Sequence, residues 1–207
     1  DPMERLSEIL FGLIMAMTFT TAFGILDGGK SDVQVMLAAA IGANLAWGFI
    51  DAIMYLMNTL AERGRLNRVL RAIKTSPNPA RAGHILASAM PSAVAKALSM
   101  TTLNDAAQAL RRLPGPSAAP KIMLADLQGA FGVFLLVVVA TFPLVIPFVF
   151  IEQPKLAVRV SDVIGITMLF IIGRSYGRIA GYPEYRMAAI MVLIGTSLVI
   201  LAVMLGG

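Results

Sequence analysis

Cysteine is absent from the 207-residue sequence, and histidine occurs once, as His84. The chain can therefore form no disulfide, no thiolate metal site and no cysteine nucleophile. A metal site built from several imidazoles within one chain is excluded too, as is any serine–histidine pair that does not use His84. The sequence also lacks a Gly-rich phosphate loop and a catalytic carboxylate pair, so we do not expect an enzyme.

Charge is also scarce: 14% of the residues are charged, whereas 57% are hydrophobic and the mean hydropathy is +0.78. These values exclude an ordinary soluble domain and are typical of a polytopic membrane protein. The 13 methionines are expected mainly to fill gaps between apolar helices, with a minority available as soft metal ligands. We therefore expect the lipid bilayer, and not a nucleic acid, to be the main partner of this basic chain.

Five apolar stretches are each about as long as a helix that crosses a bilayer, which needs about 20 residues. The first has no small-residue cleavage site, so it is expected to be a span and not a signal peptide. The stretches are Ile9–Leu26, Val33–Leu60, Leu127–Ile151, Val163–Ala180 and Met187–Leu205, and Glu152–Asp162 is expected to be a short connector between the third and the fourth. The sequence thus predicts an all-α integral membrane protein with helices 1–2 in residues 1–60, an insertion over 61–124, and helices 3–5 in 125–207.

The insertion is polar, basic and helical in pattern. Ala61–Lys74 is expected to continue the second span as an amphipathic helix, followed by helices over Ala80–Met100, interrupted at Pro91, and Leu103–Leu113. Its arginines either bind anionic lipid head groups, form a solvated face, or pack against a partner's insertion. Gly- and Pro-rich segments at Asp27–Asp32 and Leu113–Pro120 are expected to be a turn and a linker.

Basic residues are distributed unequally between the two sides of the predicted bundle. All but three of the 17 lysines and arginines fall at the N-terminus, in the insertion or near the turn between spans four and five; the exceptions are Lys30, Lys155 and Arg159. The positive-inside rule then places the N-terminus and the insertion in the cytoplasm and the C-terminus on the opposite side. A bacterial inner membrane is the expected location.

The second span contains one formal charge, Asp51, with Asn44 seven residues earlier, Asn58 seven residues later and Tyr55 four residues later. Helical spacing puts these residues near one stripe, beside Gly48. A carboxylate at bilayer depth costs roughly 2.5–3.5 kcal/mol, so it marks a functional site by default.

Two roles are open for Asp51. It could exchange a proton for a metal ion, with Asn44 as a second hard ligand and Met15 or Met54 as a soft one, and so hold Fe²⁺ or Mn²⁺. Alternatively, it joins helices through hydrogen bonds to Asn44, Tyr55 or Trp47. Pro143 and Pro147 in the third span similarly either expose carbonyls to an ion or only kink the helix.

The layout resembles the vacuolar iron transporter family. The matching segments are Phe11-Gly12, Gly42-Ala43-Asn44-Leu45, Phe142–Phe148 and the passage Gly173…Arg178…Gly181. The resemblance implies a homodimer that exchanges ferrous iron or manganese for protons near the dimer interface. It implies a transported metal substrate and no resident cofactor.

The sequence departs from this family in two places. Met15 stands about where the first span usually carries an aspartate, and the insertion has ten basic residues in place of glutamates spaced to bind metal. A cationic insertion repels divalent metal, so no metal-storage role is expected for it. The sequence leaves two functions: a proton-coupled iron or manganese antiporter that depends on Asp51, or a membrane scaffold that keeps the fold and binds a partner without transport.

Overall fold

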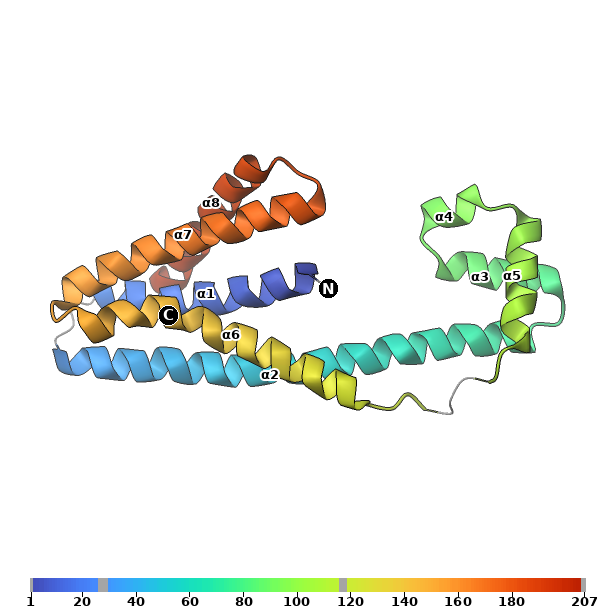
Figure 1. Cartoon of the computed structure of the whole chain (residues 1–207), viewed down its shortest axis with the longest axis horizontal. Coiled ribbons are helices and arrows are strands. Elements are labelled where there is room, and N and C mark those ends of the chain that lie inside the picture. The colour runs from blue at the N-terminus through green and yellow to red at the C-terminus, as the bar shows by residue number, and fades with distance from the viewer. Residues whose placement is uncertain (1, 26–29, 116–118, 206–207) are drawn as a thin grey trace. The chain divides into compact units, whose positions relative to one another are not determined.

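The computed structural model describes residues 2–25, 30–115 and 119–205, and this part of the chain forms helices and no strands (Figure 1). In chain order the helices are α1 (Pro2–Ile25), α2 (Lys30–Thr75), α3 (Pro79–Ala89), α4 (Ser92–Ala97), α5 (Met100–Arg112), α6 (Leu124–Phe150), α7 (Pro154–Ala180) and α8 (Glu184–Met204). The all-helical fold class predicted from the sequence is confirmed. Residues 27–29 of the expected turn and 116–118 of the expected linker lie outside the described residues, and Lys30–Asp32 already belong to α2.

Five of these helices are long and apolar enough to cross a membrane: α1, α2, α6, α7 and α8. These helices indicate a membrane-embedded protein. α2 has 46 residues. At about 1.5 Å per residue it would be about 69 Å long, roughly twice the thickness of a bilayer's hydrocarbon core. The second apolar stretch therefore continues as helix beyond any membrane, as the pattern over Ala61–Lys74 predicted.

The fourth spanning helix begins earlier than the sequence suggested. Residues 152–162 were expected to be a connector, whereas α7 already starts at Pro154. Proline is well tolerated at the first position of a helix, where its missing N–H costs nothing. Buried residues recur here every four positions, at Ala157, Ser161 and Gly165. This charged segment is therefore the first part of a helix that has one packed face.

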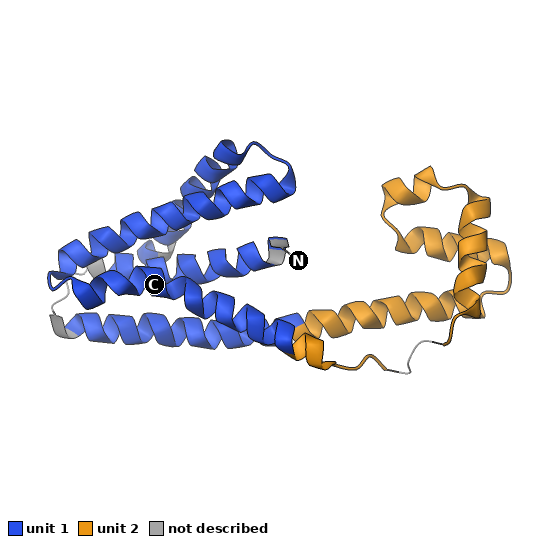
Figure 2. Ribbon diagram, viewed as in Figure 1, with its two compact units in different colours: residues 1–55, 128–207 blue, residues 56–127 orange. Residues whose placement is uncertain are grey.

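The chain divides into two compact units, coloured separately in Figure 2: residues 1–55 with 128–207, and residues 56–127. The smaller unit has its own apolar core, centred on Ile73, Ala82 and Ala107. Its helices α3 and α4 are interrupted at Pro91, as expected. Arg63 donates to both carboxylate oxygens of Asp126, at 2.6 and 2.7 Å, within this unit.

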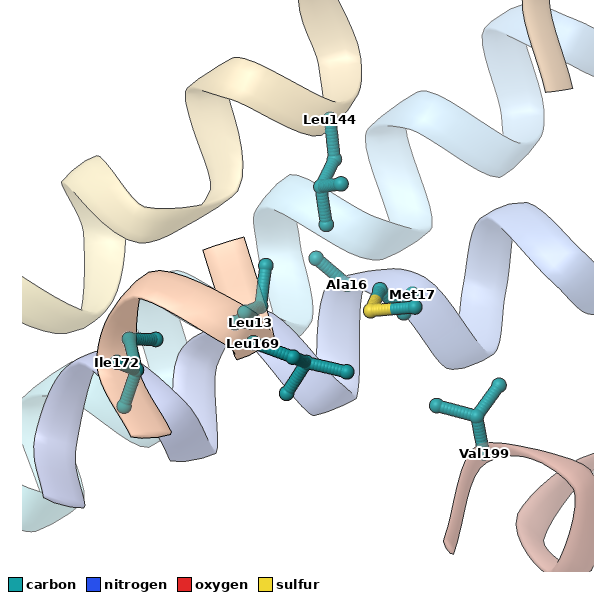
Figure 3. Packing of buried hydrophobic residues seen from close by; sticks show 7 residues of the cluster. All are labelled: Leu13, Ala16, Met17, Leu144, Leu169, Ile172 and Val199. Atoms are coloured by element: carbon teal, nitrogen blue, oxygen red, sulfur yellow. The ribbon is translucent and has the colours of Figure 1, made fainter. Parts of the chain in front are cut away.

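The larger unit is built on contacts among α1, α7 and α8. Seven buried residues form its main core, and Figure 3 shows them contributed by α1, α6, α7 and α8: Leu13, Ala16, Met17, Leu144, Leu169, Ile172 and Val199. Met17 fills a gap against Gly165 of α7, which is the packing role expected for most methionines.

Glycine allows the closest approach between α7 and α8. A Cβ atom at Gly173 would lie 2.5 Å from Cβ of Met191 and 2.8 Å from Cα of Ala188. Small residues at such contacts let helices in lipid pack backbone against backbone, which replaces the hydrophobic driving force that lipid does not supply. The pair then turns at Gly181, whose φ of 75° is left-handed and favours glycine.

We expect Gly173→Ala to lower the thermal unfolding midpoint of the detergent-solubilised protein, since overpacking costs about 1–3 kcal/mol. Gly132→Ala is the matched control, because nothing lies within 4 Å of a Cβ atom there. The control should unfold at the same temperature or higher, since alanine favours a helix by about 1 kcal/mol over glycine. Equal midpoints for the two variants would show that α7 and α8 are not in close contact.

Candidate functional site

Asn44 joins three helices of the larger unit. Its side chain is 1% exposed. The side-chain Nδ2 donates to the carbonyl of Gly12 in α1, at 3.2 Å, and to the hydroxyl of Thr141 in α6. Gly12 also lets α1 and α6 approach closely, since a Cβ atom there would lie 2.8 Å from the carbonyl oxygen of Val137. The predicted polar stripe on α2 therefore faces α1 and α6, and Asn44 holds the three together.

Three contacts define how α2 and α6 lie side by side. Asn44 meets Thr141, Gly48 lies against Phe134 and Val137, and the Tyr55 hydroxyl lies against Gly129. Residue numbers rise along α2 as they fall along α6, so the two helices are antiparallel here.

Asp51 lies along α2 between the Gly48 and Tyr55 contacts, level with residues 129–134 of α6. That stretch reads Gly-Ala-Phe-Gly-Val-Phe and has no polar side chain. Oδ2 of Asp51 is buried and has no hydrogen-bond partner among the described residues. A buried acceptor without a partner costs about 1–3 kcal/mol, and more if it is charged. Two amide oxygens, Oδ1 of Asn44 and Oδ1 of Asn104, are likewise buried without a partner among the described residues, so Asp51 is the ionisable member of this set.

The bonds predicted between Asp51 and its neighbours are not the ones found. Asn44 binds Gly12 and Thr141, and Trp47 is 42% exposed and packs edge-on against Phe11, with ring centroids 5.4 Å apart. The role of joining helices thus belongs to Asn44. Asn58, on the same predicted stripe, is exposed, and so is His84 in α3.

The four predicted metal ligands do not share one position. Asn44 and Asp51 are seven residues apart in one continuous helix, which separates them by about 10 Å along its axis. An asparagine binds a metal through Oδ1, and Oδ1 of Asn44 is buried without a partner among the described residues, while Nδ2 is bonded to Gly12 and Thr141. Met54 is one turn beyond Asp51 and 52% exposed, and Met15 is half-buried in α1. Within the described residues, no three acidic, histidine or cysteine side chains are grouped so that they could hold a metal ion.

Sequence reasoning missed a second acid inside a spanning helix. Asp162 was assigned to a connector, but it lies in the third turn of α7, half-buried, and accepts a hydrogen bond of 3.2 Å from the Thr21 hydroxyl of α1. The signal was available: Pro154 at a helix start, followed by apolar residues at helical spacing. Asp162 differs from Asp51 in having a donor from a neighbouring helix.

The proline pair of α6 is held by α7. Ser161 is fully buried, and its hydroxyl donates to the carbonyl of Leu144, at 2.9 Å. Leu144 lies between Pro143 and Pro147, both inside the helix. Serine side chains commonly bond backbone carbonyls near such prolines in membrane helices. The contact joins α7 to the segment between the prolines; the carbonyls that lose their helical donor are those of Val139 and Pro143, so both roles of the proline pair stay open.

Comparison with known proteins adds no assignment: no protein-family model matches this chain, and no similar sequence is found among curated proteins.

The bond between Asn44 and Thr141 can be measured by a double-mutant cycle. We expect Asn44→Ala and Thr141→Val to be coupled by about 0.6 kcal/mol, the average found for hydrogen bonds between membrane helices, and by no more than about 1.7 kcal/mol. Thr167→Val is the control partner, because Thr167 is exposed and its hydroxyl donates to Val163 in its own helix. Asn44→Ala should be additive with Thr167→Val. A coupling below that of the control pair would show that Asn44 does not join α2 to α6.

Proposed function

We propose that this chain is a membrane transporter for a divalent cation, Fe²⁺ or Mn²⁺, which it exchanges for protons. The observation that carries the proposal is the buried Oδ2 of Asp51, which has no partner among the described residues and lies in an apolar helix of spanning length. An ionisable group in such a place marks an ion or proton pathway by default.

The chemistry follows from the two states of one carboxyl group. With a proton bound, Asp51 is neutral and compatible with the apolar stretch of α6 opposite it. When a divalent cation arrives, the carboxylate becomes an oxygen ligand and the proton leaves, so binding of metal and of proton are mutually exclusive. One carboxylate with water as the remaining ligands holds an ion weakly enough to release it, as transport requires.

A homodimer would supply a second Asp51. Beside the polar stripe, α2 exposes a row of large apolar side chains: Phe49, Ile50, Ile53, Met54 and Met57. This row suits either lipid or the same row of a second copy. A two-fold contact here would place the soft sulfur of Met54 at the interface, near both carboxylates. The basic residues support an N-terminus and an insertion in the cytoplasm of a bacterial inner-membrane protein.

A second function has its own support. A scaffold that binds a partner needs no ion ligands, and Asn44 already gives the polar stripe of α2 a structural role, since its Nδ2 bonds α2 to α1 and α6. In a scaffold, the polar stripe would serve to hold helices together through the hydrogen bonds of Asn44, and Asp51 would stay protonated.

Uptake into proteoliposomes separates the two functions. With a pH gradient, we expect wild-type protein to take up Mn²⁺ and Fe²⁺, and Asp51→Asn to fall to the rate of protein-free vesicles. Asp162→Asn is the matched control, since it removes a carboxylate from another spanning helix, one that already accepts a bond from Thr21. It should retain most of the uptake. If wild type and Asp51→Asn are equally inactive, the scaffold function is correct.

A further inference from the structure

A compact group of charged and aromatic side chains lies where α7 turns into α8. The Glu184 carboxylate accepts hydrogen bonds from Nε of Arg174 at 2.7 Å and from Nε and Nη2 of Arg178 at 3.0 and 3.2 Å. Two guanidinium groups and one carboxylate leave one net positive charge. Arg174 uses only Nε in this contact, so its two Nη groups keep N–H donors for another acceptor.

Aromatic rings connect this group to the body of the helix pair. The Arg174 guanidinium lies over the ring of Tyr185, 5.2 Å from its centroid. The Tyr185 ring is in turn 6.4 Å from that of Phe170. Stacking and the ion pair together fix the guanidinium plane, so its free edge is preorganised for a planar or tetrahedral anion.

An apolar groove continues from Phe170 between the same two helices. Its volume is about 570 Å³, and it is lined by Ile166, Thr167, Phe170, Ala189, Val192 and Leu193. Arg174 and Ile166 are eight residues apart in α7, so groove and guanidinium extend over about 12 Å of helix. Both helices are of spanning length and composition, and the groove runs away from their connecting turn.

We propose that this groove and the arginine pair bind one anionic phospholipid, with its phosphodiester against Arg174 and Arg178 and an acyl chain along the groove. A single phosphodiester balances the one net positive charge and accepts from the free Nη groups, as arginine and phosphate commonly do. The turn between two spans is where head groups of a bilayer lie, and the apolar lining is where its chains lie. A helix of a second copy would fill the groove but leave the arginine charge unbalanced.

The test uses full-length purified protein and native mass spectrometry, with phosphatidylglycerol or phosphatidylcholine added in equal amounts. We expect wild type to retain phosphatidylglycerol preferentially. Arg178→Gln removes one cation while Arg174 still pairs with Glu184, and it should weaken phosphatidylglycerol retention about fivefold. Ala189→Trp fills the groove, leaves both arginines in place, and should reduce retention by a similar factor.

Arg186→Gln is the control, because Arg186 is an exposed cation on α8 just two residues from Glu184 and so on another face. It should leave retention unchanged. The proposal is wrong if Arg186→Gln weakens retention as much as Arg178→Gln, which would indicate only general surface charge. It is also wrong if Ala189→Trp has no effect on lipid, or changes the number of copies in the complex instead.

Discussion

A polar atom placed among apolar helices must find a partner, because lipid and apolar side chains provide none. This constraint explains the arrangement of α1, α2 and α6. Nδ2 of Asn44 meets it with the Gly12 carbonyl and the Thr141 hydroxyl, and the hydroxyl of Ser161 meets it with the carbonyl of Leu144. Each of these bonds joins one helix to another, so the polar atoms fix which faces of the helices are in contact.

In the described part of α2, the constraint is left unmet at Oδ2 of Asp51 and at Oδ1 of Asn44, and of these two groups only Asp51 is ionisable. Oδ2 of Asp51 is buried although the residue as a whole is half-buried, and residues 129–134 of α6, level with it, have no side-chain donor. A sequence selected only for helix packing would place a serine or an apolar residue here at lower cost. An acid without a donor is understandable if the missing partner comes and goes, as a proton and a transported cation do. Asp162, with Thr21 beside it, shows the stable alternative in the same bundle.

Much of the architecture could be predicted from the sequence, because apolar length and helical spacing are local properties. Five spanning helices, the continuation of α2 and the break at Pro91 all follow from such patterns. The predicted start of α7 was wrong because Lys155, Arg159 and Asp162 are typical of a connector. In the structure they belong to a helix whose packed face carries the buried residues Ala157 and Ser161. The partners of Asn44 could not be predicted at all, since they lie 32 and 97 residues away in sequence.

The central claim is that the Asp51 carboxyl group binds a divalent cation in exchange for a proton. Infrared difference spectroscopy of the purified protein, recorded with and without Mn²⁺, observes this directly. The account predicts loss of a protonated-carboxyl band and gain of a carboxylate band on Mn²⁺ addition, both absent in Asp51→Asn and both retained in Asp162→Asn. The same spectral change in wild type and Asp51→Asn would contradict it.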